Sequence, residues 1–408
     1  MGYTTHTLQG FSWQTILKFA TAGIALIKIS LLSRILTPSD FGVFAIVLVA
    51  LGMSEAMTQT GINITLLQTT RNLRYYLSTA WVIAIVRGFL IATIMTLLGV
   101  FLARYYHNPT LAPLIALAAL VPLIKGCINP SIITYQKELQ FSKEVVFRLT
   151  LSFIETTATV IFALVLQSPL ALLLGLVFVA TAEVCASFYF FSERPTLQFH
   201  KARAKDILRN SLGLSPASLL SYIGDNIDDF LIGKLLGTYK LGLYHNAYAL
   251  SHKPNYDVSK ALNYSTLPIF TKIITDKPRL RAAYFKSSLA LLGLIILLSL
   301  PLFIFPSQLV TLLFGDKWLA IVPVLPLLVL AGVFQSCNNL GYNLWLATKK
   351  YALLNLHLAT SVITLIIGLL YFVPHNDFYG AGQAILFSRL LPLPLLALGI
   401  YRSLRHAT

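Results

Sequence analysis

Runs of about 20 largely apolar residues follow one another along this chain, with short polar connections between them. A helix that crosses the hydrocarbon core of a bilayer needs about 20 such residues. Twelve segments meet this requirement: 11–35, 41–60, 77–102, 111–134, 145–166, 169–191, 211–233, 240–266, 284–306, 319–347, 350–373 and 380–402. Charged residues make up only 11% of the 408 residues, whereas soluble domains contain about 25%. The sequence therefore predicts an all-α, polytopic membrane protein with twelve transmembrane helices.

The basic residues are divided unequally between the two sides of the predicted bundle. Of the 31 Lys and Arg residues, 19 fall in connections on one side and 5 on the other. Because cytoplasmic loops of membrane proteins are enriched in Lys and Arg, this asymmetry predicts that both termini are cytoplasmic. The net charge of +16 is then explained by topology, and nucleic acid is not expected as a partner.

The second half of the sequence repeats features of the first. Residues 34–46, RILTPSDFGVFAI, align without a gap on residues 234–246, KLLGTYKLGLYHN. A basic cytoplasmic connection, 193–210, lies between the halves. The sequence therefore predicts two pseudo-symmetric six-helix bundles, residues 1–192 and 211–408, joined by this linker. Because each half has an even number of helices, the two halves are expected to be related by an axis along the membrane normal.

The first helix of the second half carries acids near its centre. Asp225, Asp228 and Asp229 fall within about one helical turn of an otherwise apolar segment, and Tyr222 shares their polar stripe. A charged side chain at the bilayer centre costs at least ~2.5–3.5 kcal/mol on insertion scales. Several acids on one face therefore indicate a hydrated or protein-lined cavity.

Charged and polar side chains inside predicted helices are the candidates for function. The residues expected to line the substrate cavity are Lys28, Arg87, Lys125, Tyr222, Asn255 and Arg389. The carboxylates expected to exchange a coupling H⁺ or Na⁺ are Glu55, Glu155, Asp225, Asp228 and Asp229. In the repeat register Lys28 is equivalent to Asp228. The alternative interpretation is that these acids and bases pair with one another only to make their burial tolerable.

Sequence motifs for catalysis, metals or cofactors are absent. The chain has no Gly-rich phosphate loop, no paired Cys or His at metal-ligand spacing, and no nucleophile elbow. We therefore expect no catalytic residue, no metal site and no cofactor beyond the coupling ion. A membrane-embedded polymerase, ligase or glycosyltransferase is disfavoured because the predicted outer loops are short and contain few acids.

Three stretches of the sequence resemble a known transporter family. They are SRILTPSDFGVFAIV, DNIDDFLIGKLLGTYKLGLYHNAYAL and LLFGDKW. Together they resemble the polysaccharide transport family, which includes the Wzx-type flippases of the multidrug/oligosaccharidyl-lipid/polysaccharide exporter superfamily. The resemblance implies that undecaprenyl-pyrophosphate-linked O-antigen, capsule or exopolysaccharide units are moved to the outer leaflet of the bacterial inner membrane. The acidic pattern of the family's seventh helix falls on Asp225, Asn226 and Asp228.

The resemblance also implies which partners the protein has and which other function must be considered. It implies contact with membrane lipids and the lipid-linked oligosaccharide, and a glycan polymerase with its chain-length machinery as further candidates. The alternative is a cation- or proton-coupled multidrug exporter of the same superfamily. An exporter of cationic drugs is expected to have a mainly acidic cavity, whereas acids and bases are equally frequent inside the predicted helices. The flippase is therefore the favoured hypothesis.

Overall fold

The computed structural model describes residues 3–58, 62, 66–67, 69, 73–191, 193–209 and 214–405. Over these residues all regular structure is helical, which confirms the all-α prediction. Seven of the described helices are long and apolar enough to cross a membrane, or eight if a bent pair counts as one span. One of them, Tyr351–Leu404, has 54 residues and is long enough for two crossings. The protein is thus a polytopic membrane protein, and its helices are consistent with twelve spans.

Internal contacts divide the chain into two units, Met1–Asn226 (unit 1) and Ile227–Thr408 (unit 2). The division falls inside helix α11 (Leu214–Ser251). The connection 193–210, expected to link the two bundles, belongs to unit 1 in this division. The bundle limits 1–192 and 211–408 stay a prediction.

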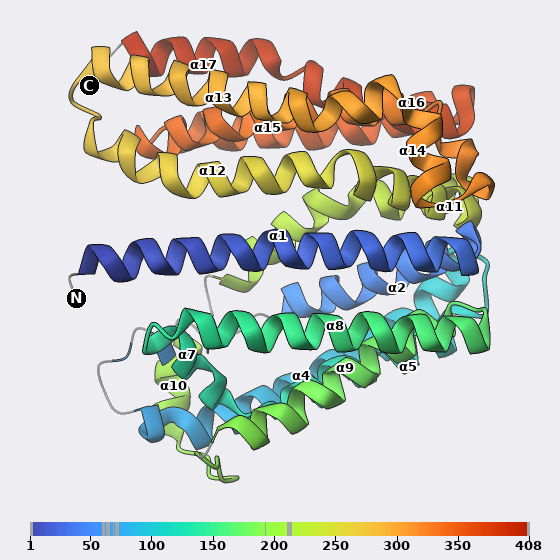
Figure 1. The fold of residues 1–408 in the computed structure, drawn as a ribbon, viewed down its shortest axis with the longest axis vertical. Helices are drawn as coiled ribbons and strands as arrows, with labels where there is room; N and C mark the ends of the chain where they lie inside the picture. Colours follow the sequence, from blue (N-terminus) through green and yellow to red (C-terminus); the bar gives the residue numbers. More distant parts are fainter. Residues whose placement is uncertain are drawn as a thin grey trace. The chain divides into compact units, whose positions relative to one another are not determined.

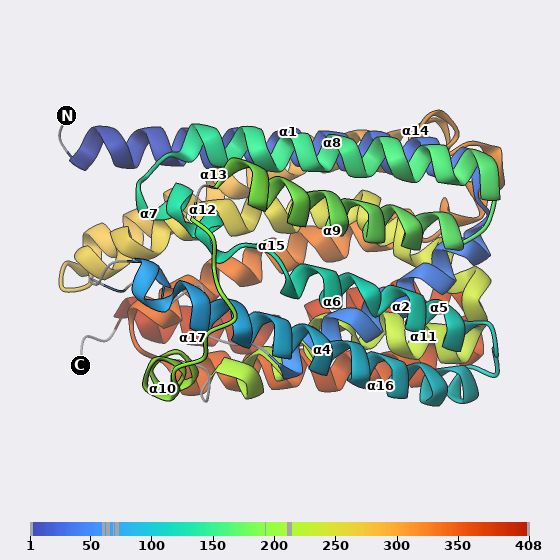
Figure 2. The same ribbon diagram turned by 90° about the horizontal axis from the view of Figure 1, so that it is seen from below.

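Unit 1 is a bundle of helices of unequal length (Figure 1). They are α1 (Tyr3–Ile35), α2 (Pro38–Met57), α4 (Leu73–Tyr105), α5 (Leu111–Ala118), α6 (Leu120–Gly126), η1 (Pro130–Ile133), α7 (Thr134–Lys137), α8 (Phe141–Leu166), α9 (Leu170–Phe190) and α10 (Lys201–Arg209). Figures 1 and 2 show that α1 and α8 run side by side, and α8 also packs on α9. This packing sets which polar side chains can meet across the bundle.

The predicted span 111–134 is broken in the structure. Leu111–Gly126 and Pro130–Lys137 meet at an angle of 70°. Asn129 has extended backbone, its side chain accepts a hydrogen bond from the amide of Ser131, and Pro130 starts the next helical turn. Because proline fixes its own backbone and disfavours a helical residue before it, the chain turns at this point.

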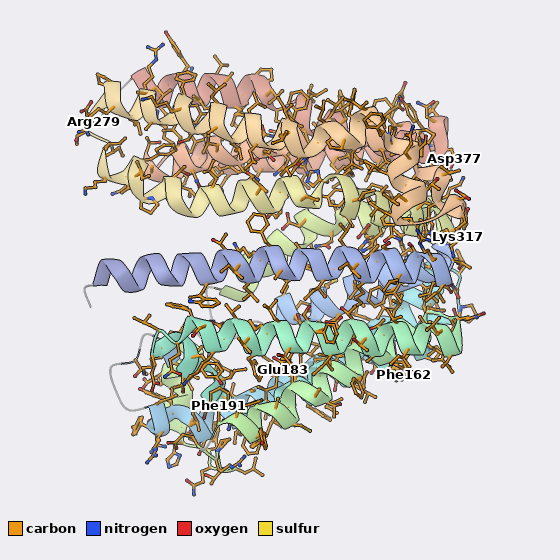
Figure 3. The ribbon with its side chains drawn as sticks, viewed as in Figure 1. Phe162, Glu183, Phe191, Arg279, Lys317 and Asp377 are labelled. Carbon is orange, nitrogen blue, oxygen red and sulfur yellow. The ribbon has the colours of Figure 1, made fainter. Side chains whose placement is uncertain are left out.

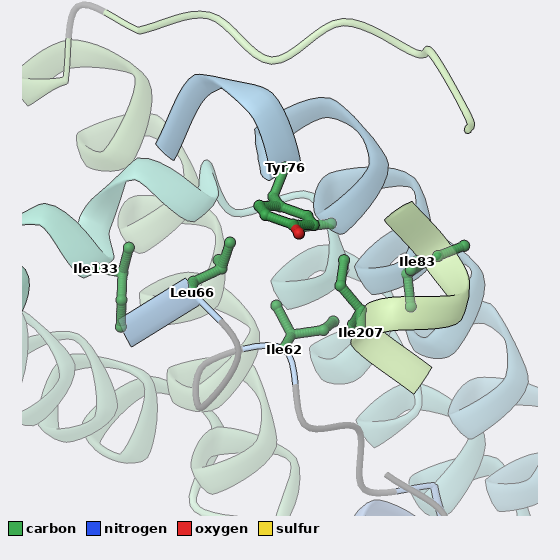
Figure 4. Packing of buried hydrophobic residues seen from close by; sticks show 8 residues of the cluster. Ile62, Leu66, Tyr76, Ile83, Ile133 and Ile207 are labelled. Carbon is green, nitrogen blue, oxygen red and sulfur yellow. The ribbon is translucent and has the colours of Figure 1, made fainter. Parts of the chain in front are cut away.

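Helix α10 packs on α4 within unit 1 through a small apolar core, shown in Figure 4. This core contains Ile62, Leu66, Tyr76, Ala80, Ile83, Ile133, Ala204 and Ile207. The Tyr76 hydroxyl also donates to Asp206 at 3.3 Å, and the guanidinium of Arg203 lies 4.0 Å from the ring centroid of Tyr75. The connection between the halves therefore contains a helix that is fixed to α4.

Unit 2 is organised around α15, which packs on the helices before and after it. Its elements after α11 are α12 (Lys253–Lys272), α13 (Lys277–Ile304), α14 (Pro306–Leu313), η2 (Asp316–Ile321), α15 (Leu325–Ala347), α16 (Tyr351–Leu390) and α17 (Leu393–Arg405). In Figure 1, α12, α13, α15 and α17 run alongside one another. Helix α16 bends at Asp377, which has φ 51° and ψ −133°.

A second bend divides α11 at Gly237, where φ is 78° and ψ is 176°. This conformation is accessible to glycine because it has no Cβ. In the repeat alignment Gly237 matches Thr37, the N-cap of α2 and the site of the break between α1 and α2. Both halves thus break their first helix at the same register. The predicted span 240–266 is interrupted in the structure, because α11 ends at Ser251 and α12 (Lys253–Lys272) begins after His252.

Candidate functional site

The structure brings together two predicted site residues in unit 1, Lys28 on α1 and Glu155 on α8. Lys28 Nζ lies 2.5 Å from Glu155 Oε1, and the two side chains are 19% and 27% exposed. The pair forms because α1 lies along α8, so that residues far apart in sequence meet. The carboxylate balances the charge of Lys28, while both groups remain partly accessible.

A second pair of opposite charges in unit 1 is longer and more open. Lys125 Nζ on α6 lies 4.0 Å from Glu183 Oε2 on α9, with the Lys125 side chain 44% exposed. Figure 3 labels Glu183 on α9. Glu183 is not among the residues predicted for the site, although an acid inside an apolar segment is a signal for one.

Arg87 on α4 binds the C-terminal end of α2. Its Nε donates to the carbonyl of Thr58 at 2.7 Å, and its Nη2 donates to the carbonyl of Glu55 at 3.2 Å. A cation at this end of a helix satisfies free carbonyls and complements the helix dipole. The structure therefore places the predicted residues Arg87 and Glu55 together, through the backbone of Glu55; the Glu55 side chain itself is exposed.

Tyr222 lies in the part of α11 that belongs to unit 1 and packs on α2. Its hydroxyl is within hydrogen-bond distance of the carbonyls of Leu48 at 3.2 Å and Val49 at 3.4 Å. Gly52 makes room for the ring, because a Cβ there would lie 2.4 Å from the Tyr222 hydroxyl. Tyr222 is thus held by packing and by backbone acceptors. Asp225, one turn later, is exposed.

The predicted acids Asp228 and Asp229 bind aromatic side chains from beyond the bend of α11. The Tyr244 hydroxyl donates to Asp228 Oδ2 at 2.5 Å, and His245 Nδ1 lies 3.2 Å from Asp229 Oδ2. Asp228 is only 7% exposed and Tyr244 only 1%. Tyr244 and His245 were not predicted as partners of these acids. Each lies sixteen positions after its acid, and the two come into contact only because α11 bends at Gly237.

Asn255 on α12 lies inside unit 2 and is 2% exposed. Its Nδ2 donates to Ser299 Oγ on α13 at 2.9 Å. Its carbonyl accepts from the Ser336 hydroxyl on α15 at 3.2 Å. Asn255 therefore joins three helices of unit 2 by hydrogen bonds.

Arg389 lies near the end of α16, and its Nε is buried without a hydrogen-bond partner. Arg389 therefore places a positive charge that is only partly exposed near the end of α16. Over the described residues, no group of three or more His, Cys, Asp or Glu side chains is arranged to hold a metal ion.

The chain is similar to known proteins of polysaccharide biosynthesis. A family model described as "polysaccharide biosynthesis protein" matches residues 31–323. The lipopolysaccharide biosynthesis protein WzxC of Escherichia coli K12 is 26% identical over 345 residues, which cover 83% of this chain and 69% of WzxC.

Two solved transporter structures have the same fold. The lipid II flippase MurJ, in an inward closed conformation, aligns with a TM-score of 0.62 at 13% identity, over 95% of this chain and 87% of MurJ. The MATE multidrug transporter DinF-BH aligns with a TM-score of 0.60 at 15% identity, over 100% of this chain and 98% of DinF-BH. At these identities the likeness establishes the fold.

Proposed function

Because the chain belongs to the polysaccharide biosynthesis protein family, we propose that it is a flippase for an undecaprenyl-pyrophosphate-linked oligosaccharide. It moves an O-antigen, capsule or exopolysaccharide unit from the inner to the outer leaflet of a bacterial inner membrane by alternating access. The similarity to WzxC and the fold shared with MurJ support this proposal. Translocation breaks no covalent bond, so the protein is a transporter that needs no catalytic residue.

The observation that carries the proposal is the ion pair between Lys28 and Glu155. A pyrophosphate group offers the ammonium of Lys28 stronger charge-assisted hydrogen bonds than one carboxylate does. We propose that the headgroup displaces Glu155 from Lys28 and that Glu155 returns when the headgroup leaves. Because both side chains are partly exposed, this exchange costs less desolvation than it would at a fully buried pair. Lys125, paired loosely with Glu183, would bind the headgroup in the same way.

The remaining candidate residues have smaller or different roles in this proposal. Arg87, Tyr222, Asn255 and Arg389 were expected to line the substrate cavity, and Glu55, Asp225, Asp228 and Asp229 to exchange H⁺ or Na⁺. Arg87 and Tyr222 donate to backbone carbonyls of α2 and its C-terminal end. We therefore expect them to fix the position of α2 rather than to bind the charged headgroup. The assignments of the acids stay predictions.

Complementation of a strain without its own flippase tests the proposal. We expect Lys28→Gln to abolish surface glycan at normal protein levels, and Lys28→Arg to retain part of it because a guanidinium also binds phosphate. Full glycan production by Lys28→Gln would contradict the assignment. Failure of the wild-type chain to complement, with resistance to cationic dyes instead, would favour the multidrug exporter.

The orientation of the chain is also part of the proposal. We propose that both termini are cytoplasmic, and the excess of Lys and Arg on one side supports this orientation. A C-terminal reporter that is active only in the cytoplasm tests this. Glycan polymerase and chain-length proteins are the proposed partners, and co-purification of the tagged chain with them would support their assignment.

A further inference from the structure

The described part of the connection between the predicted bundles, residues 193–209, is held on α4 of unit 1. Arg74 Nε on α4 donates to Glu193 Oε1 at 2.7 Å. The amide of Thr196 donates to Ser78 Oγ on α4 at 3.1 Å. Helix α10 then packs on α4 through the apolar core of Figure 4. The connection therefore presents a defined surface at one end of unit 1.

Helix α10 runs crosswise to the long helices of unit 1. Figures 1 and 2 show it at the end of unit 1 where α4 begins, lying across the direction of α4, α8 and α9. These three helices are each long and apolar enough to cross a membrane. A helix that lies across such spans, at their ends, lies along the membrane surface. This is the orientation of an interfacial helix.

The sides of α10 differ in polarity. Ala204 and Ile207 are buried in the core against α4. Lys201 and Lys205 are exposed, and because they lie four positions apart they share one face. Leu208 is exposed too, and it lies at the edge between the two, three positions after Lys205 and four after Ala204. Helix α10 thus presents a basic face with an apolar edge.

Exposed apolar side chains extend this surface along the chain. Leu197 and Phe199, in the segment before α10, are 74% and 52% exposed. Tyr189 and Phe190, at the end of α9, are also exposed. Large apolar side chains beside lysines are typical of interfacial helices, in which the apolar groups reach the acyl boundary and the lysines stay among the headgroups. The surface therefore fits a lipid partner better than an acidic soluble one.

The two lysines of α10 are available for such a partner. The other groups of α10 that bear charge are used within unit 1, since the Arg203 guanidinium lies 4.0 Å from the ring centroid of Tyr75 and Asp206 accepts a hydrogen bond from α4. Over the described residues, the ammonium groups of Lys201 and Lys205 form no hydrogen bond and no ion pair. A row of two free cations attracts an anionic surface.

We propose that α10 is an interfacial anchor that binds anionic phospholipids of the cytoplasmic leaflet. Lys201 and Lys205 contact the lipid headgroups, and Leu208 enters the acyl boundary, together with Leu197 and Phe199 of the preceding segment. The anchor ties the connection between the predicted bundles to the membrane surface as well as to α4. The choice of leaflet rests on the cytoplasmic orientation proposed above, whereas the anchor itself does not depend on what the protein transports.

Fluorescence quenching of the full-length protein in lipid vesicles tests the depth of α10. Cys127, Cys185 and Cys337 are replaced by serine, and a bimane label is attached through Leu208→Cys. The matched control is Ala202→Cys, at an exposed residue on another side of the same helix. A doxyl group near the headgroups of the vesicle lipids should quench the label at position 208 about twofold more than the label at 202. Iodide in the water should quench them in the reverse order.

Vesicle composition and two lysine substitutions test the charge. Vesicles of phosphatidylcholine are compared with vesicles that also contain phosphatidylglycerol. Phosphatidylglycerol should increase the doxyl quenching at position 208, and Lys201→Gln/Lys205→Gln should remove about half or more of this increase. High salt should reduce the increase as well, because it screens exposed charges. Lys143→Gln, at an exposed lysine of α8, is the control and should leave the quenching at 208 unchanged.

Three results would overturn the anchor. They are equal doxyl quenching at positions 202 and 208, quenching at 208 that does not respond to phosphatidylglycerol, and protection of 208 from both doxyl lipid and iodide. The last result would mean that protein, such as a second copy of the chain, covers this face. Both leaflets of the vesicles have the same composition and no transport is measured. Failure of the anchor is therefore distinct from failure of the proposed orientation or of the proposed flippase activity.

Discussion

Lys28 and Glu155 form an ion pair that joins α1 to α8 inside unit 1. At the aligned position of the second half stands the acid Asp228, whose partner is the hydroxyl of Tyr244. The two halves therefore place opposite charges at one register, and each charge is satisfied within its own unit. This arrangement fits both interpretations of the buried charges. The Lys28–Glu155 pair makes the burial of both groups tolerable, and a bound ligand can also replace one partner of the pair.

Exchanging the two charges of the unit 1 pair separates these roles. Lys28→Gln or Glu155→Gln alone should cost about 1–2 kcal/mol of stability, less than a fully buried pair because both side chains are partly exposed. The exchanged variant Lys28→Glu/Glu155→Lys should regain most of the Tm, since the attraction is restored. It should not regain glycan export if the position of the cation matters for the headgroup. Export at the wild-type level by the exchanged variant would show that the pair is only structural.

The sequence predicted some of the breaks between helices, but not which helices pack against one another. The alignment of 34–46 on 234–246 placed the break before Pro38 in register with Gly237, where the structure bends. Such breaks are local and depend on proline, glycine and capping residues. The contact between Lys28 and Glu155 spans 127 positions. It depends on which helices pack together, and one sequence does not contain this information.

The sequence also did not reveal that the interior of unit 2 is polar. The segment 319–347 has the composition of an apolar span, but α15 buries Ser336, Asn338, Asn339 and Asn343. Single amides in an apolar run do not reveal whether they face lipid, water or another helix. In the structure Asn343 donates to Thr266 on α12 at 2.9 Å. Such hydrogen bonds hold helices together inside a membrane, and their partners follow only from the packing.

Tyr244→Phe should weaken the bend of α11. It removes the donor that Asp228 Oδ2 accepts at 2.5 Å and leaves a buried carboxylate with fewer partners. We expect a loss of about 1–3 kcal/mol, measured as a lower Tm or a lower denaturant midpoint. The same change in an Asp228→Asn background should cost clearly less. Equal losses in both backgrounds would show that Tyr244 acts through packing of its ring.

Lys350 gives a prediction about pH and salt. Burial and the neighbouring charges of Lys277 and Arg402 lower the pKa of Lys350 from its usual value of 10.5. The charged amine is therefore disfavoured in the folded protein. The penalty is present below the folded pKa and disappears as the pH rises above 10.5.

Lys350→Gln should consequently stabilise the protein at neutral pH. The gain should be small, about 0.5 kcal/mol at low salt, because the side chain is largely solvated. It should shrink at about 1 M salt, where charges are screened beyond roughly 3 Å. Lys349→Gln, at the exposed neighbouring residue, is the control and should change little. A gain that persists at high salt and at alkaline pH would exclude charge repulsion as its cause.

Gly380→Ala should be among the more damaging small substitutions in unit 2. After the bend at Asp377, α16 returns on itself, and a Cβ at Gly380 would lie 2.1 Å from the carbonyl oxygen of Phe372. Backbone atoms cannot move aside as a flexible side chain does, so we expect a loss of about 2–3 kcal/mol. Gly293→Ala on α13 is the matched control, because nothing lies within 4 Å of its Cβ position. There alanine should be neutral or should stabilise the helix by roughly 0.5–1 kcal/mol. Thermal unfolding of both variants gives the comparison, and equal Tm values would mean that the two parts of α16 do not pack as closely as described.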